Sequence, residues 1–164
     1  MTHTKSKFQK ELNVLVIHGP NLHLLGKREA DIYGKASLAR INHQIKLEAQ
    51  KLGVYVTMIQ SNHEGKLVDL IGDARSSYDG ILINPAAYTH TSVALRDALS
   101  ACGIPAVEVH ISNIYGREEF RRQSFTAPVC VGQVSGFGDE SYLLGLQGLV
   151  SALRKKAKAR RKNL

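Results

Sequence analysis

Residues 13–34 read Asn-Val-Leu-Val-Ile-His-Gly-Pro-Asn-Leu-His-Leu-Leu-Gly-Lys-Arg-Glu-Ala-Asp-Ile-Tyr-Gly. The first part, Val14–Ile17, is a short apolar run that is typical of a strand buried on both faces. The rest is a long polar segment, punctuated by glycine, that carries Asn21, Arg28 and Tyr33. Open α/β proteins place ligand sites where such segments follow parallel strands. This stretch therefore predicts both the class of fold and one part of a site.

Strand and helix patterns alternate along the rest of the chain. The expected strands are 13–18, 54–60, 80–84, 106–111 and 129–134. The expected helices are 38–52, one from a Ser61–Glu64 capping box through Ala74, one from Thr91 or Ser92 through Ala101, and one that Asp139 caps and that runs into the C-terminal tail. Gly53 and Gly103 are expected to end two of these helices. A less regular piece surrounds Glu118–Arg122.

This alternation predicts an α/β fold, a flavodoxin-like doubly wound five-stranded parallel sheet with helices on both faces. Right-handed crossovers are expected to link the strands. We expect one domain over residues 1–164, with a catalytic body at about 13–153 and a basic tail at 154–164. The sequence shows no internal repeat and no low-complexity linker.

Composition narrows the class of protein. The 164 residues are enough for one domain that buries about two thirds of its unfolded surface. No apolar run approaches the roughly 20 residues that span a bilayer, and the polar N-terminus lacks the apolar core of a signal peptide. Cys102 and Cys130 lie far apart, without the spacing of a metal site or a disulfide framework. We therefore expect a cytoplasmic protein without a membrane segment.

The net charge of +8 is concentrated at the C-terminal end. Residues 154–162 hold seven basic side chains and no acid, so the body of the chain is near neutral. A terminal charge run of this kind is usually a solvated helix end. Contact of this tail with nucleic acid is the weaker interpretation.

Polar side chains lie near the end of each of the first four expected strands or just after it. In a parallel sheet these positions share one edge, so the side chains are expected to converge. They are Asn21, Arg28, Tyr33, Ser61, Asn62, His63, Asn84, Tyr88, Thr89, His90, Thr91, Glu108, His110, Ser112, Asn113, Arg117 and Arg121. Arginine supplies positive charge, and amides, hydroxyls and imidazoles supply directional hydrogen bonds. The set suits a small, anionic, hydroxyl-rich ligand.

The histidines in this set also have structural interpretations. His110 alternates with apolar residues and could be a hydrogen-bonded histidine of the core. Glu108 beside it, and polar neighbours beyond it, favour a functional edge. His90 could cap the helix that follows it instead of contacting a ligand, and we favour the ligand slightly.

The basic residues and the tyrosine are less decisive on their own. Arg117 and Arg121 lie one helical turn apart among acidic residues and could form an ordinary ion-paired surface. Arg28 and Tyr33 could be surface residues of a loop, and the residues alone leave both interpretations open.

Several kinds of chemistry are disfavoured. The histidines lack metal-ligand spacing, no serine lies in a nucleophile elbow, and the loop after the first strand carries no phosphate-binding motif. The same loop has no Ser or Thr with which to hold a flavin. Proton transfer on a small polar anion, without a cofactor or a metal, is the chemistry that remains.

Several segments together resemble one family. They are Gly-Pro-Asn-Leu at 19–22, Gln-Ser-Asn-His-Glu-Gly at 60–65, Ile-Asn-Pro-Ala-Ala-Tyr-Thr-His-Thr-Ser-Val-Ala-Leu-Arg-Asp-Ala at 83–98, Glu-Val-His-Ile-Ser-Asn-Ile-Tyr at 108–115 and Arg-Glu-Glu-Phe-Arg-Arg at 117–122. In one register from about Asn13 to Leu153, the chain resembles the type II 3-dehydroquinate dehydratases. The resemblance implies a lyase without a cofactor that reversibly dehydrates 3-dehydroquinate to 3-dehydroshikimate, by anti elimination through an enolate.

The resemblance also implies catalytic roles. Tyr33 would be the general base that removes the C2 proton, and Arg28 would close over the site and support the enolate. His110 would protonate the departing C1 hydroxyl, with Glu108 orienting it. Asn21 would hold a water or the enolate oxygen. Because a free tyrosine has a pKa near 10, a base at this position needs nearby cations, for which Arg28 and Arg117 are the candidates.

The remaining matched positions imply substrate binding and assembly. Asn84, His90 and Arg121 would bind ring hydroxyls, and Ile111 and Ser112 would bind the carboxylate. Asp97 matches a position that often reaches the site from an adjacent subunit. The family assembles as a dodecamer of trimers, so a homo-oligomer is expected.

The chain departs from the family pattern in the stretch quoted first. His18 and His23 stand where the family usually has Asn, and Ala30 replaces a usual Pro. None of these changes removes a proposed catalytic group. The alternative function is a non-catalytic flavodoxin-like binding module that uses Arg154–Lys162 on nucleic acid or on an acidic partner.

Overall fold

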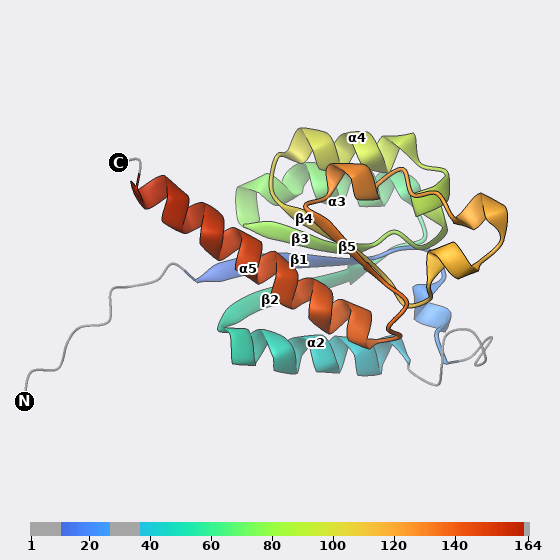
Figure 1. The fold of residues 1–164 in the computed structure, drawn as a ribbon, viewed down its shortest axis with the longest axis horizontal. Helices are drawn as coiled ribbons and strands as arrows, with labels where there is room; N and C mark the ends of the chain where they lie inside the picture. The colour runs from blue at the N-terminus through green and yellow to red at the C-terminus, as the bar shows by residue number, and fades with distance from the viewer. Residues whose placement is uncertain (1–10, 27–36, 163–164) are drawn as a thin grey trace, which may run out of the picture.

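The computed structural model describes residues 11–26 and 37–162 (Figure 1). Its centre is a five-stranded parallel sheet in the order β2-β1-β3-β4-β5. The strands are β1 Leu12–His18, β2 Val54–Gln60, β3 Gly80–Asn84, β4 Ala106–His110 and β5 Gly132–Ser135. This is the strand order of the doubly wound, flavodoxin-like class, so the predicted fold is confirmed.

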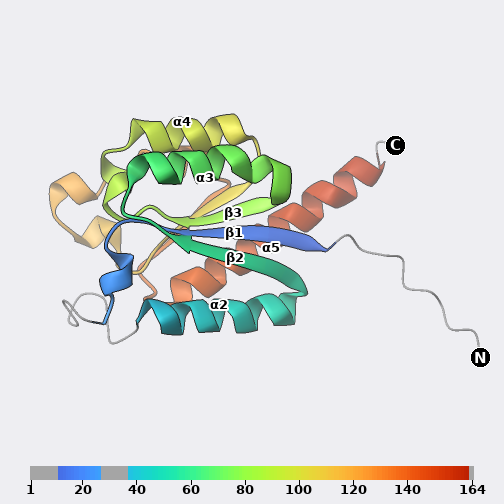
Figure 2. The same cartoon turned by 180° about the vertical axis from the view of Figure 1, so that it is seen from behind.

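Helices cover both faces of the sheet (Figures 1 and 2). They are α2 Leu38–Leu52 and α5 Glu140–Lys162 on one face, and α3 Glu64–Ser77 and α4 Val93–Cys102 on the other. Because side chains alternate along a strand, Val14 and Val16 of β1 pack toward α2 and α5, whereas Leu15 and Ile17 pack toward α3 and α4. Burial on both faces is why the stretch Val14–Ile17 of this strand is apolar at every position.

The predicted helix ends are right in three cases. The Ser92 hydroxyl accepts a hydrogen bond from the Leu95 N–H and caps α4. Gly53 and Gly103 follow α2 and α4 in the left-handed region, with φ of 63° and 70°, where glycine avoids the steric cost of a side chain.

The predicted capping box at Ser61 is wrong. Helix α3 begins at Glu64, and His63 is its N-cap residue. The backbone N–H of Ser61 donates to the carbonyl of His18 at 3.0 Å, which keeps Ser61 on the sheet edge. Its hydroxyl instead accepts from the His63 N–H at 3.0 Å and tightens the turn that leads into the helix.

The predicted fifth strand begins too early. Val129 belongs to a short 3-10 helix, Ala127–Val129, and the strand itself starts at Gly132. Pro128 lies in the first turn of the 3-10 helix, and a proline there has no N–H to contribute to a sheet ladder. The less regular piece near Glu118 contains a second 3-10 helix, Glu119–Arg121.

Three hydrogen-bonded polar side chains lie inside the core between the sheet and α5. The phenol of Tyr142, fully buried on α5, contacts Nδ1 of His18 at 3.0 Å and accepts from Nδ2 of Asn84 at 3.1 Å. Since Asn84 donates to the phenol oxygen, the phenol hydrogen points to His18 and Nδ1 acts as the acceptor. Burial lowers the pKa of His18 to about 4, although a hydrogen bond from His18 to the Asn42 side chain opposes the shift. The imidazole is therefore neutral near pH 7.

No helix in the described ranges 11–26 and 37–162 is both long and apolar enough to cross a membrane.

The neutral state of His18 predicts how acid affects folding. Below its unfolded pKa of about 6.5, the unfolded chain takes up a proton that the folded chain refuses until the pH reaches about 4. Stability from His18 is thus present above pH 6.5 and is lost as the pH falls through this window. His18→Asn should reduce the loss between pH 6.5 and 4 by on the order of 3 kcal/mol. Urea unfolding of the wild type and of His18→Asn across this pH range measures the difference in stability. If the two plots of unfolding free energy against pH are parallel, the prediction is wrong.

Candidate active site

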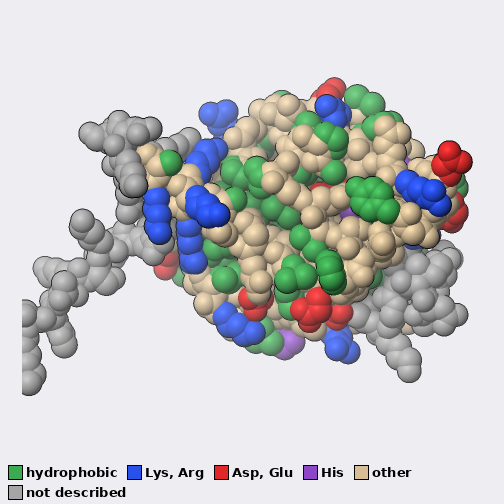
Figure 3. All heavy atoms as spheres, viewed as in Figure 1, with side chains coloured by type: hydrophobic (Ala, Val, Ile, Leu, Met, Phe, Trp, Pro, Cys, Tyr) green, Lys and Arg blue, Asp and Glu red, His purple; other side chains and the backbone are tan. Residues whose placement is uncertain are grey.

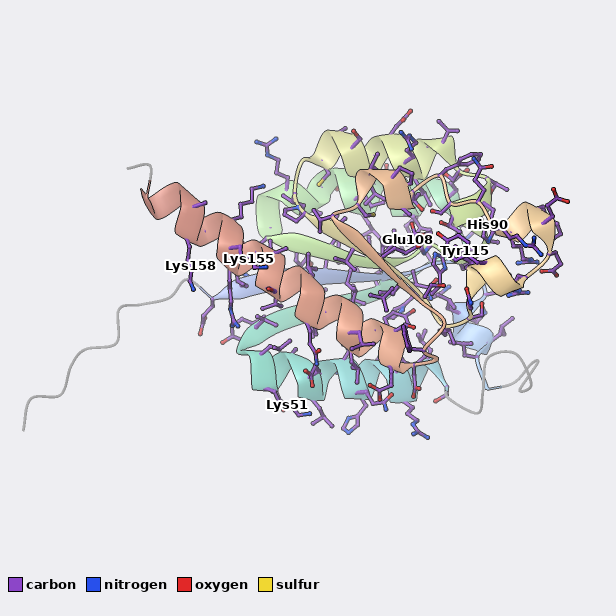
Figure 4. The ribbon with its side chains drawn as sticks, in the orientation of Figure 1. Lys51, His90, Glu108, Tyr115, Lys155 and Lys158 are labelled. Atoms are coloured by element: carbon purple, nitrogen blue, oxygen red, sulfur yellow. The ribbon has the colours of Figure 1, made fainter. Side chains whose placement is uncertain are left out.

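A cavity of about 290 Å³ opens at the carboxyl ends of the parallel strands. Its lining residues are Pro20, Asn21, Leu22, Leu24, Leu25, Asn84, Ala86, Ala87, His90, His110, Ile111, Ser112, Ile114, Arg117 and Arg121. In Figure 4 the labelled His90 and Glu108 lie at this end of the molecule, whereas Lys155 and Lys158 lie at the opposite end, on α5. The space is of the size that a small ligand needs.

The structure brings most of the predicted site residues together. Eight of them line the cavity, namely Asn21, Asn84, His90, His110, Ile111, Ser112, Arg117 and Arg121. Glu108 lies directly beneath His110. Asp97, exposed on α4, is not among the lining residues. Arg28 and Tyr33 lie outside the described residues, so their predicted roles stay predictions.

A tight hydrogen bond joins His110 to Glu108 at the end of β4. Nε2 of His110 lies 2.6 Å from Oε1 of Glu108, and both side chains are nearly or fully buried. Because a carboxylate can only accept, Nε2 carries the hydrogen and Nδ1 is left for a second partner. A histidine held in this way can give or take a proton in a fixed direction.

Four further side chains donate to the Glu108 carboxylate. Thr89 Oγ1, Ser124 Oγ and Gln133 Nε2 approach its Oε1 at 3.0, 2.9 and 2.8 Å, and Thr126 Oγ1 donates to its Oε2. Burial alone would raise the pKa of Glu108, but the hydrogen bond and charge of His110, with the Thr126 and Gln133 hydrogen bonds, outweigh it and lower the pKa. Glu108 is therefore a buried anion that holds the imidazole of His110 in place through their hydrogen bond.

His90 and Asn84 enter the cavity with their orientations fixed. Nδ1 of His90 lies 2.7 Å from the carbonyl oxygen of Gln123, so Nδ1 donates and Nε2 is the acceptor. Burial first, then repulsion from His110 and Arg121, lowers the pKa of His90 despite the Gln123 bond. Asn84 is clamped between the Tyr142 phenol and the Ala86 N–H. Both residues can therefore bind ligand hydroxyls with a defined polarity.

Two guanidinium groups give the cavity its positive charge. Nε of Arg117 and Nε of Arg121 lie 3.4 and 3.3 Å from the same carboxylate oxygen of Glu118. One anion thus holds two cations together, which leaves a net positive charge at the rim. The salt-bridged surface expected as an alternative is real, but it lines the cavity rather than standing apart from it.

The loop after β1 packs directly on the loop after β3. The Gly19 N–H donates to the Asn84 carbonyl at 2.8 Å, and a Cβ at Gly19 would lie 2.5 Å from the carbonyl oxygen of Pro85. Only glycine allows this approach. The approach brings Asn21 to the same cavity as Asn84.

Sequence reasoning missed the Glu108 donors as a group. Thr89 was named only as one of many edge residues, and Ser124, Thr126 and Gln133 were not identified. Gln133 lies opposite Glu108 in the β4–β5 register; the expected strand 129–134 contained it, but the pattern of that strand does not give its register. Ser124 and Thr126 lie in irregular chain, where no periodicity marks them. Among the described residues, no three His, Cys, Asp or Glu side chains gather as metal ligands.

Comparisons with known proteins agree with this site. The family model described as dehydroquinase class II matches residues 12–150. A 3-dehydroquinate dehydratase of Trichodesmium erythraeum is 61% identical over 142 residues, covering 87% of this chain and 95% of the relative. The crystal structure of type II dehydroquinase from Butyrivibrio crossotus aligns with a TM-score of 0.83 at 45% identity, covering 86% of this chain and 99% of that one. The chain belongs to the class II dehydroquinase family.

Proposed function

We propose that this chain is a lyase that dehydrates 3-dehydroquinate to 3-dehydroshikimate. The observation that carries the proposal is the buried Glu108–His110 pair, which faces Asn21, Asn84 and two arginines in one small cavity within the family match. A proton donor on a buried anion suits the loss of a hydroxyl group as water. The arginines suit an anionic substrate.

The chemistry divides into two proton transfers. Tyr33, as phenolate, takes the C2 proton, and the electron pair moves onto the carbonyl oxygen to form the enolate. When the enolate collapses, the C1–O bond breaks and His110 gives the leaving hydroxyl a proton, so that water departs. Tyr33 ends protonated and His110 neutral, and one proton transfer between them through solvent restores both. Arg28 and Arg117 supply the positive charge that keeps Tyr33 anionic.

The rest of the cavity binds and orients the substrate. Asn21 holds a water or the enolate oxygen, where negative charge develops. Ile111 and Ser112 hold the carboxylate, through backbone and hydroxyl groups. Asn84, His90 and Arg121 bind the ring hydroxyls. The side chains of Asn84 and His90 are already oriented by hydrogen bonds within the protein. No cofactor or metal takes part in this scheme.

Assembly and cellular context extend the proposal. We infer a homo-oligomer, a dodecamer of trimers, in which Asp97 of one subunit reaches the site of its neighbour. The place of Asp97 on exposed α4, away from the cavity of its own chain, supports this. The reaction belongs to the shikimate route to aromatic amino acids or to quinate breakdown, in the cytoplasm.

The first prediction concerns activity itself. Purified protein given 3-dehydroquinate, in buffer with a metal chelator, should form a conjugated enone that absorbs in the ultraviolet. Turnover should be unchanged in a chain that ends at Leu153, because the basic end of α5 lies away from the cavity (Figure 4). No turnover by either protein would overturn the proposed function. Salt-sensitive nucleic-acid binding that is lost with the tail, together with no dehydratase activity, would instead support the binding-module alternative.

The second prediction concerns the two proton-transfer groups. Tyr33→Phe and His110→Ala should each lower kcat by about 10²–10⁴-fold, while the affinity for a non-reactive substrate analogue changes little. Tyr55→Phe and His43→Ala are matched controls, because both side chains are exposed and neither lines the cavity. Steady-state kinetics and analogue titration measure both effects. Normal turnover by Tyr33→Phe would show that the base is another group.

The third prediction concerns assembly. Native mass spectrometry should find a dodecamer of the 18.0 kDa chain. Asp97→Ala should lower activity, and a mixture of Asp97→Ala with His110→Ala subunits, reassembled from dissociated chains, should regain part of it. Activity returns only if Asp97 of one subunit and His110 of another act in the same site. A monomer with full activity would contradict the shared site.

A further inference from the structure

Asn21 has a backbone conformation that needs support. Its φ is +65°, in the left-handed region, and it is one of two non-glycine residues with positive φ in the described part of the chain. Such a conformation carries a steric cost for a residue with a side chain. It persists where surrounding contacts hold it, and positions of this kind cluster at functional sites.

The supporting contacts come from two amide side chains at the end of β2. The backbone N–H of Asn21 donates to Oδ1 of Asn62 at 2.9 Å. Nε2 of Gln60 donates to the same Oδ1 at 2.9 Å and to the carbonyl oxygen of Gly19 at 3.1 Å. Two hydrogen bonds therefore brace the short segment between Gly19 and Asn21, and a third joins the two amide side chains that make them.

The polarity of these amides is fixed by the backbone. The Asn21 N–H can only donate, so an oxygen of Asn62 must face it. The Gly19 carbonyl can only accept, so the NH₂ of Gln60 must face that atom. Asn62 thus serves only as an acceptor, and Gln60 only as a donor.

Asn62 is itself tied to a third loop. Its backbone carbonyl accepts from the phenol of Tyr88 at 2.8 Å, and Tyr88 belongs to the 3-10 helix after β3. Neither Asn62 nor Gln60 lines the cavity. Both act on the site only through the segment that they hold.

We propose that Asn62 and Gln60 are positioning residues that hold Asn21 in its left-handed conformation, with its side chain placed for the reaction. The proposal rests on the proposed function for its kinetic readout, because Asn21 is assigned there to the developing enolate. Loss of this support should lower kcat more than it changes KM, since the contact of Asn21 is made mainly in the transition state.

The test uses two amide-to-acid substitutions with opposite expected results. Asn62→Asp keeps an oxygen that accepts from both Asn21 and Gln60, so kcat should stay within about threefold of the wild type. Gln60→Glu replaces a donor by an anion that faces two acceptors, so kcat should fall by about 10- to 100-fold. The two variants add the same charge at neighbouring positions, which removes charge alone as an explanation.

Apolar variants and a control complete the series. Asn62→Leu removes the acceptor and should lower kcat as Gln60→Glu does. Lys66→Leu makes a comparable change at a nearby exposed position on α3 that does not line the cavity, and should leave kcat unchanged. Because Asn62 is exposed, thermal unfolding should shift little in the Asn62 variants.

A second measurement separates this proposal from the proposed function. Hydrogen exchange by mass spectrometry should show a protected amide in a peptide that contains Asn21 in the wild type and in Asn62→Asp, and faster exchange in Asn62→Leu and Gln60→Glu. This readout needs no activity, so an inactive wild type would overturn only the proposed function. Equal exchange in all four proteins, or equal loss of kcat in Asn62→Asp and Gln60→Glu, would overturn the positioning role.

Discussion

The fully buried carboxylate of Glu108 is the constraint on which the site depends. An isolated buried anion is strongly disfavoured, so it persists only where several donors converge on it. Those donors come from the segment after β3, from β4 itself, from the loop at 124–126 and from β5. Each of these segments must therefore hold its place for Glu108 to stay ionised. The fold fixes His110 through the same requirement, because His110 is one of the donors.

The fold could be predicted from sequence because one physical rule governs most of it. Strands buried on both faces are apolar at every position, as in Val14–Ile17, and the helices between them show the 3.6-residue period. The rule fails where hydrogen bonds to distant chain decide the outcome. Ser61 looks like a helix cap, yet its backbone is held at the sheet edge by His18. Val129 has the apolar character of a strand residue, yet the turn at Pro128 delays β5.

The part of the candidate site that lies at the strand ends could be predicted from the sequence together with the sheet. Residues at the carboxyl ends of strands, such as Asn84 and His110, converge because parallel strands end at one edge. The donors around Glu108 were not predictable, since Ser124 and Thr126 reach it from irregular chain that no periodicity describes. The support of Asn21 by Asn62 and Gln60 was also invisible, because polarity at an amide depends on which backbone atom it faces. The resemblance named Arg28 and Tyr33, and these lie outside the described residues.

The net charge of the chain is a poor guide to the electrostatics of the site. Basic side chains gather at the C-terminal end of α5 (Figure 3), whereas the helix begins at Glu140, beside the edge where β5 ends. At 1.5 Å per residue, Lys155 lies about 22 Å along the axis from that start. This is more than two screening lengths of about 8 Å at physiological ionic strength. The tail therefore adds little to the field at the cavity. Among the described residues, the cations placed to attract an anionic substrate are Arg117 and Arg121, which Glu118 holds at the rim.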